Sequence, residues 1–131
     1  MKKDRILNPE LIAQIASIGH TEYLVIADAG LPIPAGVKVI DLSVVRGLPG
    51  FLQVLDAVNE ELVTEAYILA SEMPEVSPQL YHDTCERLAG KTRTLVSHET
   101  LKEMTRRAKA VIRTGETTSY ANVILVAGVN F

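Results

Sequence analysis

The stretch Tyr23-Leu24-Val25-Ile26-Ala27 is a continuous apolar run near the start of the chain. Such a run is typical of a central parallel strand that other elements cover on both faces. It is followed by Asp28-Ala29-Gly30-Leu31-Pro32-Ile33-Pro34-Ala35-Gly36, whose two glycines and two prolines indicate an ordered loop. We therefore expect residues 23–27 to lie inside a sheet and Asp28 to lie at its edge.

Helical and strand patterns alternate around this run. Asn8-Pro9-Glu10 opens a helix with an N-cap residue, a proline and an acid, and Gly19 is placed to end that helix in a left-handed conformation. Later strands are predicted at 37–40, 64–70, 94–96, 110–112 and 123–126, and later helices at 51–62, at 100–109 and from Ser77-Pro78 to about Ala89, with a turn at 71–75. This alternation predicts an α/β fold: a single domain over residues 1–131 with a largely parallel, Rossmann-like sheet flanked by helices.

Composition excludes several classes of function. The chain has 131 residues, 47% of them hydrophobic, which suits one folded domain. A net charge of -3 and the absence of Trp argue against a nucleic-acid partner. The single cysteine, Cys85, fits a reducing compartment, and no apolar stretch approaches the length of a membrane span. We expect a cytoplasmic protein with no membrane partner.

Polar residues follow several of the predicted strands. Asp28 follows the first strand and His98 follows the strand at 94–96, and ligands of open parallel sheets bind beyond such carboxyl ends. Tyr120 and Asn122 end the polar loop between the last two strands, and both side chains can hydrogen-bond a polar ligand. Each also has a plain structural interpretation, since Asp28 could form a turn and His98 could precede a helix.

His20 lies just past the first predicted helix, where it could interact with the helix dipole or transfer protons near neutral pH. His82 is predicted to lie on a solvated helix face, and Cys85 on the same helix is expected to be core. His20 and His98 have no metal-ligand spacing, and the chain has no glycine-rich phosphate loop. These residues suit proton transfer on a polar small molecule, with neither metal nor cofactor.

Several motifs resemble the D-ribose pyranase family of sugar mutarotases, in the same order and spacing from Met1 to Phe131. They are Gly19-His20-Thr21, Ile26-Ala27-Asp28-Ala29-Gly30-Leu31-Pro32, Ile40-Asp41-Leu42, Ser97-His98-Glu99, and the segment from Ala110 through Gly115-Glu116 to Tyr120-Ala121-Asn122. The glycine and proline after Asp28 favour the ribose branch over the fucose branch. Residues 59–94 contain no matching motif, so the resemblance assigns no role there.

The resemblance implies that the protein is an isomerase that interconverts the pyranose and furanose forms of D-ribose without a cofactor. It implies that His20 is the proton donor. Sugar binding is implied for Asp28, His98, Tyr120, Ala121 (through its backbone) and Asn122, with Lys102 as a weaker candidate. The family forms decamers of two stacked pentameric rings, so a homo-oligomer is expected.

Two other functions stay open. A non-catalytic sugar-binding or regulatory module of ribose uptake would have similar loops but would not need a titratable group at His20. An isomerase or epimerase of a phosphorylated sugar would need a cationic cradle, for which the matched loops offer little beyond Lys102, Arg106 and Arg113.

His20 precedes the first strand whereas Asp28 follows it, so an extended strand would hold the two side chains far apart. Either the segment after Gly19 folds back along the strand, or His20 of one subunit meets the Asp28 pocket of a neighbour. We favour a site shared between subunits.

Overall fold

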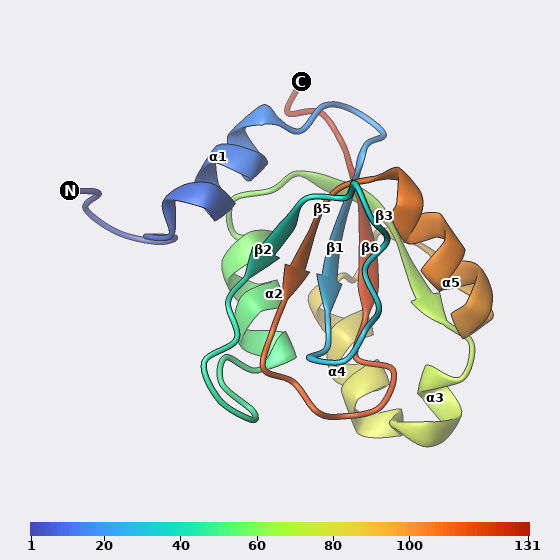
Figure 1. Cartoon of the computed structure of the whole chain (residues 1–131). Helices are drawn as coiled ribbons and strands as arrows, with labels where there is room; N and C mark the ends of the chain where they lie inside the picture. Colours follow the sequence, from blue (N-terminus) through green and yellow to red (C-terminus); the bar gives the residue numbers. More distant parts are fainter.

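The computed structural model describes all residues from Met1 to Phe131 and contains a six-stranded sheet in the order β2-β5-β1-β6-β3-β4 (Figure 1). In chain order the elements are α1 (Pro9–Ser17), β1 (Tyr23–Ala27), β2 (Val39–Asp41), α2 (Phe51–Asn59), β3 (Thr64–Ala70), α3 (Met73–Val76), α4 (Pro78–Arg87), β4 (Thr92–Val96), α5 (His98–Met104), the 3-10 turn η1 (Thr105–Arg107), β5 (Ala108–Arg113) and β6 (Val123–Ala127). The apolar run that begins at Tyr23 is an inner strand, as its composition predicts.

Five of the six strands point the same way. β1 is parallel to β5, β5 is parallel to β2, and β3 is parallel to β4, whereas β6 lies antiparallel between β1 and β3. A parallel return would require a long crossover connection, but only the loop at 114–122 joins β5 to β6. The predicted α/β fold with a largely parallel sheet is confirmed.

Alternate residues of β1 face two separate cores. Leu24 and Ile26 belong to the larger core, which α1, α2 and α4 cover. Val25 and Ala27 belong to the smaller core on the opposite face, which Leu101 of α5 covers. Because helices and loops exclude water from both faces, an inner strand of this sheet must be apolar at every position.

The first helix begins as predicted but ends earlier. The Asn8 side chain accepts a hydrogen bond from the Leu11 N–H, and Pro9 occupies the first turn. The predicted left-handed ending at Gly19 is wrong, because the helix stops at Ser17 and the left-handed residue is Thr21, with φ of 67°. The Gly19 N–H instead donates to the Glu22 carboxylate at 2.8 Å, closing the turn that leads into β1.

The helix predicted at 100–109 is wrong at both ends. α5 starts at His98 and gives way to η1 at Thr105, and β5 already begins at Ala108. The Thr105 hydroxyl donates to the Lys102 carbonyl at 2.6 Å, which tightens the last turn. The chain changes from helix to strand there, because Ala110 is fully buried and pairs with β1. The turn predicted at 71–75 also contains the start of the short helix α3.

The parallel strands bring their carboxyl ends to one edge of the sheet, which we call the loop edge. Asp28, Glu72, His98 and the loop at 114–122 all lie there, the loop ending where the reversed β6 begins. In Figure 1 the loop edge is at the bottom, and the C-terminus lies at the opposite edge. None of the helices combines the length and apolar character that crossing a bilayer requires.

Candidate functional site

Asp28 and Asn122 meet at the loop edge between the neighbouring strands β1 and β6. The Asp28 N–H donates to the Asn122 side-chain oxygen at 2.9 Å, and the Asn122 amide donates to the Asp28 carboxylate at 3.0 Å. A further bond from the Gly30 N–H, at 2.9 Å, reaches the other carboxylate oxygen. Asn122 is fully buried, so these bonds satisfy a side chain that would otherwise be costly to bury. The Asp28 carboxylate therefore has a fixed orientation.

Glu116 ties the loop at 114–122 to two other segments. Its carbonyl accepts from the Ala29 N–H at 2.9 Å, and its carboxylate accepts from the Phe51 N–H at 3.0 Å at the start of α2. Burial acts to raise the pKa of Glu116, but the bonds from Phe51, Thr118 and Thr117 outweigh it and hold the pKa below its ordinary value of 4.5. An ionised Glu116 thus fixes the loop beside Asp28.

Tyr120 and His98 lie in contact on the same edge. Their ring centroids are 5.1 Å apart at an interplanar angle of 78°, an edge-to-face arrangement. Tyr120 has φ of 62°, which is unusual for a bulky residue, and such strain clusters at functional sites. The Ser77 hydroxyl makes no capping bond to α4 but donates to the Ser119 carbonyl at 2.8 Å and supports this loop.

An open cavity of about 500 Å³ lies beside the Asp28 carboxylate. Its lining is almost entirely polar or small and comes from residues 28–30 and 116–119. A cavity of this volume has room for a small polyol, and a half-buried carboxylate is a strong acceptor for hydroxyl groups. At the same edge of the sheet, the buried Nδ1 atom of His98 makes no hydrogen bond within the chain. Buried polar atoms of this kind call for a partner, which a bound ligand can provide.

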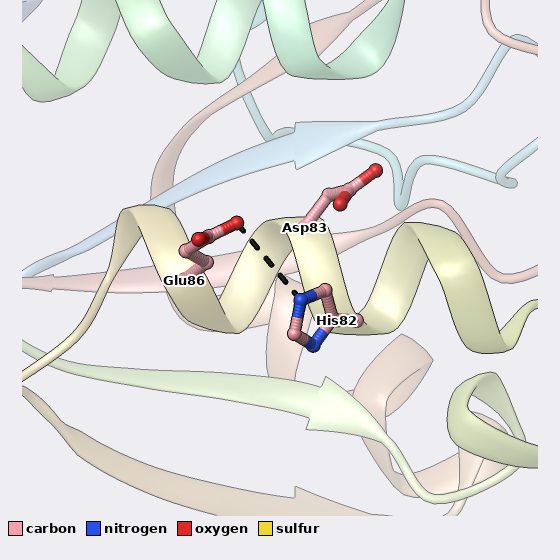
Figure 2. Close-up of side chains that lie close together, drawn as sticks. All are labelled: His82, Asp83 and Glu86. Carbon is pink, nitrogen blue, oxygen red and sulfur yellow. Dashed lines mark ion pairs between the residues drawn. The ribbon is translucent and has the colours of Figure 1, made fainter.

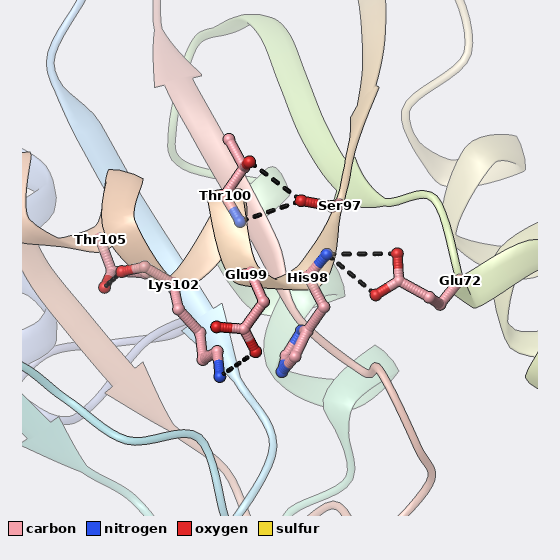
Figure 3. Close-up of polar contacts among 7 residues, drawn as sticks. All are labelled: Glu72, Ser97, His98, Glu99, Thr100, Lys102 and Thr105. Carbon is pink, nitrogen blue, oxygen red and sulfur yellow. Dashed lines mark hydrogen bonds and ion pairs between the residues drawn. The ribbon is translucent and has the colours of Figure 1, made fainter.

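Lys102 lies one helical turn beyond His98 on α5 (Figure 3). Its ammonium group pairs with Glu99 at 2.6 Å and lines a different cavity of about 260 Å³, which Pro32 and Arg106 also line. The structure thus joins Asp28 to Asn122 and His98 to Tyr120, and it places Lys102 on the flank of this group. Ala121, between Tyr120 and Asn122, is fully buried.

His20 lies at the other end of β1. The Thr21 N–H donates to the Ala127 carbonyl at the end of β6, so the segment after Gly19 does not fold back along the strand. The five residues of β1 alone span about 13 Å at ~3.3 Å per residue, which separates His20 from Asp28. Within one chain, therefore, the residue expected to donate the proton does not meet the residues expected to bind the sugar.

The surroundings of His20 suit a proton-transferring group. Its Nε2 atom lies 2.9 Å from a Glu65 carboxylate oxygen, and both side chains are about half exposed, at 51% and 44%. A cavity of about 340 Å³ adjoins His20, and its lining includes the apolar residues Ile15, Leu62 and Val129. The left-handed conformation of Thr21, a β-branched residue, marks this turn as a second strained point.

The sequence interpretation missed three carboxylates. Glu65 contacts His20, Glu116 fixes the loop beside Asp28, and Glu72 binds the His98 backbone. Glu65 and Glu72 belong to the stretch at 59–94 that had no assigned role. One signal was available: Glu72 follows the end of a predicted strand, as Asp28 and His98 do.

A further cluster of titratable side chains is exposed to solvent. His82, Asp83 and Glu86 lie together on α4 (Figure 2), and the His82 ring is 4.0 Å from the Glu86 carboxylate. The His82 and Glu86 side chains are 69% and 71% exposed, so the predicted solvated face is confirmed. Cys85 packs against the larger core, as predicted.

The chain is similar to known proteins over its whole length. A family described as the RbsD / FucU transport protein family matches residues 1–130. A D-ribose pyranase of Geobacillus kaustophilus is 55% identical over 131 residues, covering 100% of this chain and 96% of that protein. A D-ribose pyranase of Pseudomonas syringae is 50% identical over 135 residues, with 100% of both proteins covered.

Two solved structures have the same fold. Bacillus subtilis RbsD, solved in complex with D-ribose, superposes with a TM-score of 0.97 at 46% identity and covers 100% of both chains. A fucose mutarotase from Streptococcus pneumoniae, solved with L-fucose, has a TM-score of 0.80 at 26% identity over 95% of both chains. With similarity of this extent in sequence and in structure, the chain belongs to the RbsD / FucU transport protein family.

Proposed function

We propose that this protein is a D-ribose pyranase, an isomerase that interconverts the pyranose and furanose forms of D-ribose. The observation that supports this most directly is the full-length identity of 55% to a relative of that name. The near-complete superposition on a protein solved with D-ribose supports the same substrate. Residues 1–131 would then form one sugar mutarotase domain.

The reaction opens a cyclic hemiacetal and closes it again. In opening, the bond between the anomeric carbon and the ring oxygen breaks, the ring oxygen gains a proton and the anomeric hydroxyl loses one. The resulting aldehyde recloses through a different hydroxyl, which exchanges the two ring sizes. We assign the proton donor to His20, because an imidazole can give and take up a proton through its ring nitrogens and this ring is accessible.

The residues at the loop edge would hold the sugar. The Asp28 carboxylate accepts hydrogen bonds from hydroxyl groups, and its partner Asn122 keeps it oriented. His98 and Tyr120 present a ring nitrogen and a phenol on the adjoining surface. Ala121 contributes through its backbone, and Lys102 is a further candidate for a sugar hydroxyl once it releases Glu99.

A complete site would need two subunits, because His20 and Asp28 lie at opposite ends of β1. We propose that His20 of one subunit meets the Asp28 cavity of its neighbour. Apolar residues are exposed at both ends: Val44, Val45 and Leu48 follow β2, and Val129 and Phe131 adjoin the cavity beside His20. Contact between two different ends of one chain gives a ring when the rotation between neighbours closes, and we propose a decamer of two pentameric rings.

We also propose that the protein is cytoplasmic and works without a cofactor. Cys85 forms no disulfide, which suits a reducing compartment. Ring opening transfers only protons, so the side chains named above supply the chemistry that it requires.

The deciding experiment is saturation-transfer NMR on D-ribose with and without the protein. We expect the protein to accelerate exchange between the pyranose and furanose signals without changing their equilibrium amounts. A protein that binds ribose, as calorimetry would show, but leaves the exchange rate unchanged would be a sugar-binding module and would refute the enzymatic proposal.

A further inference from the structure

Glu72 reaches from the end of β3 to the start of α5. One carboxylate oxygen accepts from the His98 backbone N–H at 2.9 Å, and the other lies 3.2 Å from the same nitrogen (Figure 3). The Ser71 hydroxyl donates to this carboxylate at 2.9 Å. Glu72 thus connects the segment after β3 to the segment after β4 at the loop edge.

The hydrogen bond from His98 to Glu72 satisfies a backbone N–H that has no acceptor within the helix. His98 is the first residue of α5, so its N–H has no partner within the helix. The side chain of the N-cap residue Ser97 accepts from the Thr100 N–H, which leaves the His98 N–H to Glu72. A negative charge is also favourable at the N-terminal end of a helix.

The carboxylate is charged at neutral pH. The Ser71 hydroxyl is the largest cause that lowers the pKa of Glu72 below 4.5. Burial opposes it, and the His98 N–H adds to the lowering. Hydrogen bonds that involve a charged group are shorter and stronger than neutral ones. The first turn of α5 is therefore attached to β3 by a charge-assisted bond.

The attachment determines where the His98 ring stands. The ring lies edge-to-face with Tyr120, its centroid 5.1 Å from that of the phenol. Its Cβ branches from the carbon next to the nitrogen that Glu72 holds. Loss of this bond would free the first turn to shift, and binding groups must stay within about 0.5 Å of their productive positions.

We propose that Glu72 is a positioning residue for the sugar: its carboxylate holds the His98 backbone so that the imidazole stands against Tyr120 at the loop edge. This inference rests on the proposed function, in which His98 contacts ribose. It gives a role to a residue in the stretch at 59–94, to which the sequence assigned none.

The test is a double-mutant cycle on ribose affinity, measured by calorimetry on the assembled protein. We expect Glu72→Ala to weaken binding about 5- to 30-fold, and Glu72→Gln, which keeps an acceptor oxygen, to restore part of the loss. In the His98→Ala background, Glu72→Ala should cause little further loss, because the ring that it positions is absent. The matched control is Glu75→Ala, which removes an exposed carboxylate of α3 that makes no hydrogen bond or ion pair and should bind like wild type.

The outcomes separate the two proposals. If His98→Ala binds ribose as well as wild type, His98 does not contact the sugar, and the proposed site fails together with the inference. If His98→Ala weakens binding but Glu72→Ala does not, the positioning role alone is wrong. Equal losses from Glu72→Ala in both backgrounds would also overturn it, since Glu72 would then act independently of His98. Should Glu72→Ala not fold, Glu72→Gln takes its place in the cycle, with the same criterion of non-additivity.

Discussion

Asp28 and Asn122, 94 residues apart in the sequence, hold each other through two hydrogen bonds at the ends of neighbouring strands. One bond uses the Asp28 backbone and the other its carboxylate, so the Asn122 amide is engaged through both its oxygen and its nitrogen. The pair joins β1 to β6 at the edge where the proposed sugar site lies. Substitution of either residue should therefore change both the shape and the polarity of the proposed site.

Removing either member of this pair should weaken ribose binding. Asp28→Ala removes the carboxylate proposed to accept from the sugar, worth about 1.5–3 kcal/mol, whereas Asn122→Ala leaves that carboxylate in place without the amide that orients it. We therefore expect the Asp28 variant to lose more affinity in calorimetry. Affinities of both variants equal to that of wild type would show that this edge does not touch the sugar.

His20→Ala should abolish catalysis while leaving the fold intact. The ring is 51% exposed, so its removal leaves no core cavity, and loss of general acid assistance costs about 10²–10⁴-fold in rate. The measurement is saturation transfer on ribose, with thermal unfolding to verify the fold. The control is His82→Ala, which removes a more exposed imidazole on α4, at 69%, and should give the exchange rate of wild type. An undiminished rate in His20→Ala would refute the assignment.

A shared site predicts complementation between inactive proteins. His20→Ala and Asp28→Ala subunits, unfolded together and refolded, should form rings in which some interfaces pair an intact His20 with an intact Asp28. Those interfaces should recover part of the wild-type exchange rate. Native mass spectrometry identifies the mixed oligomers, and mixed oligomers without activity would contradict a site that two subunits complete.

The lowered pKa of Glu116 predicts that the free energy of unfolding depends on pH. Its pKa is held below 4.5 in the folded protein, so its contribution is present above that value and is lost as pH falls through the folded pKa. We expect Glu116→Gln to lower stability by about 1–2 kcal/mol at neutral pH and by less at about pH 3. Thermal unfolding at both pH values checks this against Glu75→Gln as a control. A deficit of the same size at both pH values would mean that the charge of Glu116 is not responsible.

Substitution of Gly115 tests how tightly the loop after β5 packs against the backbone of Leu48. A Cβ atom there would lie 2.5 Å from the Leu48 carbonyl oxygen and 2.7 Å from the Leu48 nitrogen, both of them backbone atoms. Because backbone cannot move aside easily, Gly115→Ala should destabilise the protein by about 2–4 kcal/mol in denaturant unfolding. Gly30→Ala is the comparison, since its nearest neighbour would be 3.8 Å away. Equal stability of the two variants would show that the backbone of residues 44–49 shifts to accommodate the added methyl group without lowering the free energy of unfolding.

Features that depend on a few consecutive residues were predictable. The apolar run at 23–27 has no polar face, so it could be stable only as an inner strand. Asn8 and Pro9 mark a helix start through their own backbone preferences. Asp28, His98, Tyr120 and Asn122 were identified because they border such runs, and the resemblance to a family supplied the roles assigned to them.

Only the tertiary structure decided which of these residues meet. Glu72 binds the backbone of His98, 26 residues away, and Glu65 contacts His20, 45 residues away, because the sheet places their strands in the same layer. The same sheet ended the helix predicted at 100–109, since burial and pairing of Ala110 in β5 outweigh local helical preference. Periodicity and capping report the energetics of neighbouring residues, whereas strand order determines which distant side chains come within hydrogen-bonding distance. That is the physical reason why the sequence could identify the candidate groups and the distance between His20 and Asp28, while only the fold excluded a return of His20 along β1 and joined Glu72 to His98.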